Sequence, residues 1–174
     1  WAIYRRWLIP LISLFFSLFV AVQAGNQWEL WLKYWEGVPF QRPDPLFGRD
    51  IGFYVFTLPF WNYLRSLAMS LLVLSLIGSA GVYFLEGNIW MSAQGLRTTR
   101  PARKHLFLLG SLLLLCLAVG FYLDRYDILY STRGVIYGAN YADVEVLLPA
   151  LGILAILALL AALVLLLSVF RQGN

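Results

Sequence analysis

The stretch LLPALGILAILALLAALVLLLSVF at residues 147–170 decides the fold class, because it is apolar along almost its whole length and carries no charged side chain. A helix of about 20 apolar residues is long enough to cross the hydrocarbon of a bilayer. Residues 7–25, 67–85 and 106–123 are similarly apolar and also uncharged. The sequence therefore predicts an all-α, polytopic membrane protein with four transmembrane helices and aromatic-rich interfacial segments.

The whole chain, residues 1–174, is expected to be a single transmembrane module. The second span is extended to residue 60, because Pro59 is typical of a position just before or at a helix start. The predicted spans are 7–25, 60–85, 106–123 and 147–170, with outer connections at about 26–59 and 124–146 and an inner connection at about 86–105.

Composition and charge support this class. The chain is 61% hydrophobic and 13% charged, whereas soluble proteins are about 25% charged. Basic residues gather before the first span and in residues 86–105, while the other two connections are more acidic. Basic connections stay in the cytoplasm, so we expect a multi-pass protein of the cell (inner) membrane with both termini cytoplasmic. The basic cluster is expected to meet lipid, and nucleic acid is not an expected partner.

The first outer connection begins with a tryptophan-rich segment. Trp28, Trp31, Leu32 and Trp35 recur at helical spacing. One interpretation is a helix along the membrane interface, where indole rings are enriched. The other is a continuous helix that extends the first span outward and packs its aromatic stripe on the outer connections. The residues alone leave both open.

The rest of this connection is expected to be irregular. Three prolines at residues 39–45 exclude a regular helix there. Residues 47–60 are aromatic but too short to cross, so a short helix or an extended piece is expected under cover of other protein. Arg49 and Asp50 lie between two glycines, which is typical of a tight turn.

Charged residues of both outer connections are the candidate site. We expect Arg49 or Asp50 to pair with an oppositely charged residue of the second connection, because arginine and carboxylate form strong, geometrically specific pairs. A surface for a partner or ligand, and a catalytic carboxylate pair, are the alternatives. These candidate outer-face ion-pair or interaction residues are Arg49, Asp50, Asp124, Arg125, Asp127 and Arg133.

Other polar residues are given structural roles. Arg65 lies near the outer end of the second span and is expected to reach lipid headgroups. Cys116, the only cysteine, and His105, the only histidine, cannot supply the roughly four ligands of a zinc site. We therefore expect no catalytic residue, no metal site and no cofactor. The spans are expected to pack through small residues, without an internal repeat.

Two motifs resemble those of uncharacterised protein family 0182. One is GVPF at 37–40 with DPLFGRDIGFYVFTLPF at 44–60; the other is LDRYDILYSTRGVIYGANYAD at 123–143 with LPAL at 148–151. The resemblance covers nearly the whole chain in the same order. It implies part of the membrane region of a large bacterial protein, without the leading spans, the final span and the extracytoplasmic domain. It implies no activity, and we expect the sequence to be a piece of a longer protein.

These observations predict a non-enzymatic membrane module that anchors or assembles an extracytoplasmic part or a membrane complex. Its expected partners are the lipid bilayer and other membrane helices. The alternative is a component of a transporter or export system, formed with missing spans or partners. A pathway of that kind needs polar groups along the membrane, and the apolar spans contain no Asp, Glu or His at their centres.

Overall fold

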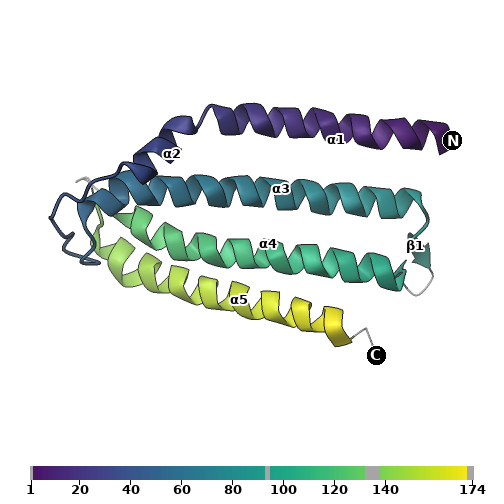
Figure 1. Ribbon diagram of the computed structural model, residues 1–174. Coiled ribbons are helices and arrows are strands. Elements are labelled where there is room, and N and C mark those ends of the chain that lie inside the picture. Colours follow the sequence, from purple (N-terminus) through teal and green to yellow (C-terminus); the bar gives the residue numbers. More distant parts are fainter. Residues whose placement is uncertain (1, 93–94, 132–137, 172–174) are drawn as a thin grey trace. The chain divides into compact units, whose positions relative to one another are not determined.

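The computed structural model describes residues 2–92, 95–131 and 138–171. The chain divides into two units, residues 1–60 and 61–174, which are described separately. Helices dominate both units (Figure 1). In chain order the elements are α1 (Ala2–Gly25), α2 (Trp28–Trp35), a π-helical turn (Phe53–Thr57), α3 (Leu58–Leu85), β1 (Ile89–Ser92), β2 (Gly95–Thr98), α4 (Arg100–Asp127), a 3-10 turn (Ile128–Tyr130), a second π-helical turn (Asp143–Leu147) and α5 (Leu148–Arg171).

Three continuous helical segments in the described residues are long and apolar enough to cross a bilayer. They are Phe53–Leu85, Arg100–Tyr130 and Asp143–Arg171. The prediction of four spans is therefore confirmed for three. The helix α1 is present, but its described apolar segment is only Ser13–Val22. A fourth crossing by α1 stays a prediction.

The expectation of an all-α chain is wrong in the connection between α3 and α4. The strands β1 and β2 pair there as a two-stranded antiparallel sheet, with Ile89 opposite Thr98 and Ser92 opposite Gly95. The backbone N–H of Thr99 then donates to the carbonyl oxygen of Asn88, which extends the pairing toward the helices. Strands this short carry little alternation of apolar and polar residues, so the pattern of the sequence did not reveal them.

The helices α3 and α5 both begin earlier than predicted, through the same local structure. Each starts with a π-helical turn, and Pro59 or Pro149 follows the first residue after that turn. The residue before each proline donates its N–H to the carbonyl five residues back, from Leu58 to Phe53 in α3. A proline ring clashes with the carbonyl four residues back in a regular α-helix. The wider π-turn relieves this clash, so the helix continues through the proline.

These two helix starts form an internal repeat that sequence reasoning missed. Asp50 and Asn140 each immediately precede the helix, nine residues before the proline. The Asp50 Oδ1 accepts the N–H of Gly52 at 2.7 Å. The Asn140 Oδ1 accepts the N–H of Asp143 at 2.8 Å, and the Asp143 carboxylate accepts the N–H of Asn140 in return. Both caps satisfy backbone donors that a helix start leaves unpaired.

Small residues form the contact between α4 and α5, as predicted. Ala118 of α4 and Ala158 and Ala162 of α5 are buried. A Cβ atom added to Gly110 would lie 3.4 Å from Leu165 Cδ1, so the two helices also approach closely there. Apolar side chains cannot drive helices together in lipid, so close backbone approach through small residues supplies the packing.

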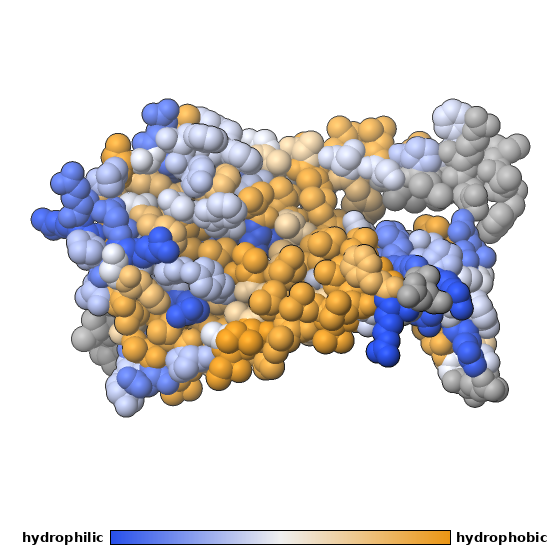
Figure 2. Space-filling view, turned by 60° about the horizontal axis from the view of Figure 1, so that its bottom comes forward, coloured by the Kyte–Doolittle hydropathy of each residue, from blue (hydrophilic) through white to orange (hydrophobic). Residues whose placement is uncertain are grey.

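The helices α3 and α4 lie antiparallel in the second unit (Figure 1). We call the end with Asn62 and Asp127 the motif end, and the end with the β-strands the sheet end. At the sheet end, the Tyr83 hydroxyl and His105 Nδ1 are hydrogen-bonded at 3.0 Å. Apolar side chains cover the middle of the long helices on the face drawn in Figure 2, and hydrophilic ones gather toward the ends.

Candidate functional site

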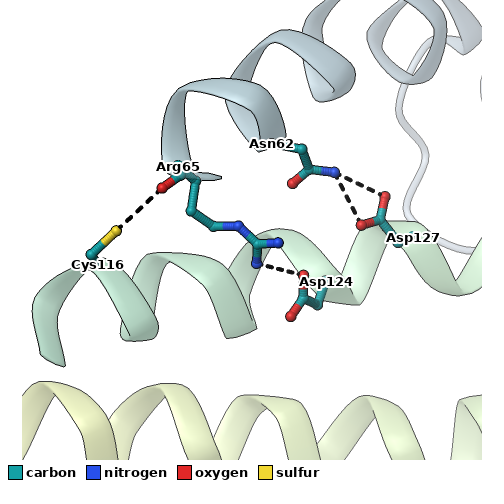
Figure 3. Close-up of polar contacts among 5 residues, drawn as sticks. All are labelled: Asn62, Arg65, Cys116, Asp124 and Asp127. Carbon is teal, nitrogen blue, oxygen red and sulfur yellow. Dashed lines mark hydrogen bonds and ion pairs between the residues drawn. The ribbon is translucent and has the colours of Figure 1, made fainter. Parts of the chain in front are cut away.

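Two polar contacts join α3 to α4 at the motif end (Figure 3). The guanidinium Nη1 of Arg65 lies 2.7 Å from Asp124 Oδ1. The side-chain amide of Asn62 donates to both carboxylate oxygens of Asp127, at 3.0 and 3.3 Å. Asn62 and Arg65 are three residues apart on one helix, and Asp124 and Asp127 three apart on the other. Residues at this spacing share a helix face, and the two contacts run in opposite chain order, as antiparallel helices require.

The site extends from Asp124 toward the apolar middle of the two helices. Cys116 Sγ donates to the carbonyl oxygen of Arg65 at 3.6 Å. Gly120 lies between Cys116 and Asp124 on α4, and a Cβ atom added there would lie 2.7 Å from Arg65 Nη1 and 3.2 Å from its Cδ. Gly120 therefore leaves the room that the Arg65 side chain occupies. Arg65 is held by Asp124, which corrects the expectation that it reaches out to headgroups.

A groove between α3 and α4 begins beside this cluster. It has a volume of about 480 Å³, and its walls are almost wholly apolar. Leu64, Ala68 and Leu72 line it from α3, and Leu112 and Leu115 from α4. The Arg65, Asn62 and Tyr83 contacts thus lie toward the two ends of these helices, and a mostly apolar groove lies between them.

A second cavity, of about 390 Å³, lies at the motif end beside α4 and α5. Its lining includes three carboxylates, from Asp124, Asp127 and Asp143, and hydroxyls from Tyr130 and Ser131. Each carboxylate already accepts a hydrogen bond from Arg65, Asn62 or the Asn140 backbone. Within the described residues, no group of three or more His, Cys, Asp or Glu is arranged to hold a metal ion. The three carboxylates thus have structural partners.

The first motif forms a separate cage in the first unit, around Asp44. One carboxylate oxygen accepts the N–H groups of Leu46 and Phe47, at 2.8 and 2.7 Å. The other accepts the N–H of Arg49 and the hydroxyl of Tyr54, both at 2.8 Å. Asp44 is buried. Sequence reasoning missed it, although the spacing D-P-L-F is typical of an aspartate that accepts nearby backbone N–H groups in a turn.

Asp50 has a similar role in the same loop. Its Oδ1 accepts the N–H groups of Phe40 and Gly52, at 2.9 and 2.7 Å, and its Oδ2 accepts that of Arg42 at 3.1 Å. The Arg49 guanidinium lies over the Phe53 ring, 5.1 Å from its centroid. The Asp50 carboxylate is therefore stabilised by backbone N–H groups of its own unit.

These contacts shift the pKa values of both loop carboxylates. Burial alone would raise the pKa of Asp44, but the hydrogen bonds from Phe47, Tyr54, Arg49 and Leu46 together outweigh it and leave that pKa lowered. The pKa of Asp50 is also lowered, chiefly by the hydrogen bond from the Phe40 backbone. Both groups are thus held as carboxylates at neutral pH.

Two glycines allow the loop around Asp44 and Asp50 to fold this tightly. A Cβ atom on Gly52 would lie 2.8 Å from Asp50 Oδ1 and 3.0 Å from the carbonyl oxygen of Val38. Gly48 has φ +65°, a left-handed conformation that glycine adopts readily. The predicted tight turn at Arg49 and Asp50 is confirmed by the pairing of Pro43 with Asp50 and by the N–H of Gly48, which donates to the Asp44 carbonyl oxygen.

The comparisons with known proteins agree with these motifs. The profile of an uncharacterised protein family, UPF0182, matches residues 2–174. A UPF0182 protein of Salinispora arenicola is 41% identical over 161 residues, which cover 87% of this chain and 16% of the relative. The UPF0182 protein FRAAL6027 of Frankia alni is 35% identical over 170 residues, which cover 98% of this chain and 17% of the relative. No solved structure matches the chain.

The chain belongs to UPF0182. It spans about 16% of the length of the curated relatives it matches first, as the resemblance of the two motifs implied. The structure gives this UPF0182 chain a physical account of both motifs: the first folds into the Asp44 cage, and the second supplies Asp124 and Asp127 to α3 and Asn140 to the start of α5.

The predicted pairing between the two motifs stays a prediction for this UPF0182 chain. Arg49 and Asp50 belong to the first unit, and Asp124, Arg125 and Asp127 to the second. Arg133 lies outside the described residues. The Arg125 guanidinium lies 5.7 Å from the centroid of the Tyr122 ring.

Proposed function

We propose that this UPF0182 segment is a non-enzymatic membrane module that anchors and positions an extracytoplasmic part or a membrane complex. One observation carries the proposal: polar contacts join α3 to α4 near their ends, with apolar walls between them. A membrane anchor needs apolar side chains in its middle, where lipid surrounds it, and polar contacts near its ends that hold its helices together. This arrangement supplies both.

The lengths of the relatives support a positioning role. The matched relatives are about six times as long as the part that this chain covers. The described residues carry their charged contacts at helix ends and in the Asp44 cage, where other parts of a long protein can attach. The second motif runs directly into α5. A force on the connection between α4 and α5 would therefore be passed to α5 through the Asn140 cap.

A reporter fusion tests the anchoring role. We expect a fluorescent protein fused after residue 174 to stay in the membrane fraction through an alkaline carbonate wash. In the matched variant, Leu160→Arg and Leu163→Arg weaken the membrane insertion of α5. An arginine near a helix centre opposes insertion by about 2.5 to 3.5 kcal/mol. Release of the unmodified fusion by carbonate would contradict the proposal.

The transport alternative is tested by the same chain in liposomes. We expect no ion or proton flux above that of empty liposomes, because the groove between α3 and α4 has apolar walls. Ser75 and Ser79 are polar residues within α3. Flux well above that of empty liposomes, lost in Ser75→Leu/Ser79→Leu, would favour a pore along α3 and replace the anchor proposal.

A further inference from the structure

The connection between α3 and α4, which lies wholly in the second unit, carries a cluster of positive charge. Residues 86–105 contain four basic residues and one acidic residue, Glu86, so their net charge is +3 with histidine neutral. The basic residues are Arg97, Arg100, Arg103 and Lys104. Arg100 and Lys104 are four residues apart on α4, where like charges share a helix face and repel each other. An anion beside this face would relieve the repulsion.

The hairpin of β1 and β2, next to this cluster, has an apolar face. Met91 lies opposite Leu96 in the pairing, and Trp90 lies opposite Arg97. Opposite residues share a face of a sheet and successive residues alternate between faces, so Met91 and Leu96 project from the same face. They are 85% and 67% exposed. A hairpin of two strands is marginally stable in water by itself, so a partner that covers this face would stabilise it.

The basic residues of α4 lie close to lipid headgroups if α4 crosses a membrane. Lys104, Arg103 and Arg100 precede Leu106, where the apolar stretch begins, by two, three and six residues. At 1.5 Å per residue these are about 3, 4.5 and 9 Å. The headgroup layer is about 5 to 7.5 Å thick on each side, so Arg100 lies about 1.5 to 4 Å outside it. This gap is shorter than the Debye length of about 8 Å at physiological ionic strength. All three residues are therefore within electrostatic range of the headgroups.

The hairpin is held near the same helix ends. The N–H of Asn88 donates to the carbonyl oxygen of Tyr83 at 2.8 Å, in the last turns of α3. The N–H of Thr99 donates to the carbonyl oxygen of Asn88 at 2.9 Å. In Figure 1, β1 lies across the ends of α3 and α4 and does not extend away along their axes. The apolar face of the hairpin therefore stays beside the basic cluster.

We propose that the hairpin and the first turns of α4 bind an anionic phospholipid of the membrane around α3 and α4. Arg100 and Lys104 bind its phosphate, and Met91 and Leu96 contact its apolar part. An acidic protein segment or a nucleic acid would match the charges but leave the two apolar side chains in water. A phospholipid joins an anionic group to apolar chains, so it matches both features, as basic residues near a membrane surface favour.

The inference rests on the proposed membrane module, and a lipid titration tests it separately. The chain in detergent is titrated with phosphatidylglycerol, or with phosphatidylcholine that has the same acyl chains, and native mass spectrometry measures the bound lipid. We expect phosphatidylglycerol to bind about 25-fold more weakly to Arg100→Gln/Lys104→Gln, because each basic side chain near an anionic surface contributes about fivefold. Circular dichroism and gel filtration exclude variants that do not fold.

The matched control removes two positive charges from the first unit. It is Lys33→Gln/Arg42→Gln, in which Lys33 loses its 3.2 Å ion pair with Glu29, and we expect less than a twofold change in the affinity for phosphatidylglycerol. Equal affinity of the unmodified chain for both lipids, or an equal loss in the control, would overturn the inference while the membrane module stands.

Two further measurements test the apolar contact. We expect Met91→Ser/Leu96→Ser to bind phosphatidylglycerol several-fold more weakly, and glycerol phosphate, which lacks acyl chains, to bind weakly to the unmodified chain. Unchanged affinity in that variant, or glycerol phosphate binding as tightly as the lipid, would overturn the assignment to a phospholipid. A bimane label at Ile77→Cys, in a Cys116→Ala background in vesicles, reports insertion of α3. Quenching of this label by acrylamide as in water would instead contradict the proposed function.

Discussion

Arg65 of α3 and Asp124 of α4 meet at 2.7 Å beside Gly120, whose missing side chain leaves the space for the guanidinium. Their side chains are only 25% and 36% exposed, and an apolar groove begins next to them. A charge in such surroundings needs its partner, because the remaining protein offers little solvation. The pair therefore stabilises the observed register of α3 against α4.

The Arg65–Asp124 pair is expected to contribute measurably to stability. In a double-mutant cycle of Arg65→Met and Asp124→Asn, we expect a coupling energy of about 1 to 3 kcal/mol, between the values for exposed and for buried pairs. Unfolding by sodium dodecyl sulfate in mixed micelles measures it. The exposed Glu29–Lys33 pair is the control, with an expected coupling of about 0.5 kcal/mol or less. Equal coupling in both cycles would show that burial adds nothing to the Arg65 pair.

Gly120→Ala is expected to displace Arg65 from Asp124. The new Cβ would lie 2.7 Å from Nη1 and 3.2 Å from Cδ of Arg65, so the whole end of the side chain must move. We expect a loss of about 1 to 3 kcal/mol, as for an overpacked site, in the same unfolding assay. Gly78→Ala in α3 is the matched control, because nothing lies within 4 Å of its Cβ position. Similar losses in both variants would point to a general effect of alanine in these helices.

The Asp44 cage is expected to open in acid. Its folded-state pKa is lowered from 3.8, so the carboxylate stabilises the folded loop above that value, and the stabilisation is lost as the pH falls through the lower, folded value. Amide hydrogen exchange of residues 44–54, compared between neutral and strongly acidic pH, should show loss of protection at Phe47 and Arg49. In Asp44→Asn the protection should already be low at neutral pH. Unchanged protection in that variant would contradict the role given to the carboxylate.

The two ends of α4 are expected on opposite sides of the membrane, with the sheet end in the cytoplasm. The basic residues near the sheet end favour this orientation. Single cysteines at Ser92 and Ser131, in a Cys116→Ala background, should react with an impermeant maleimide from opposite sides of sealed vesicles. Labelling of both from the same side would refute the topology.

The long apolar helices could be predicted from the sequence because their hydrophobic runs leave few alternatives. The starts of α3 and α5 could not, since a proline in a pattern normally marks a helix start, and only the π-turn lets the helix begin before Pro59 and Pro149. The residues Asn62 and Arg65 matched Asp124 and Asp127 in spacing, yet this match has meaning only once α3 and α4 are known to be neighbours. Asp44 was missed because its partners are backbone groups, which leave no charge partner to search for.

The π-turn before α3 also sets how far α3 is rotated about its axis relative to the residues before the turn. A π-turn uses one more residue per hydrogen-bonded ring than an α-turn, and each residue turns a helix by about 100°. If residues 53–57 rewound as an α-helix, the helix that follows them would turn by about a quarter-turn relative to the residues that precede them. The proline at residue 59 opposes this rewinding. The equal length between the Asp50 cap and Pro59 and between Asn140 and Pro149 thus gives the two helix starts the same rotation from cap to proline.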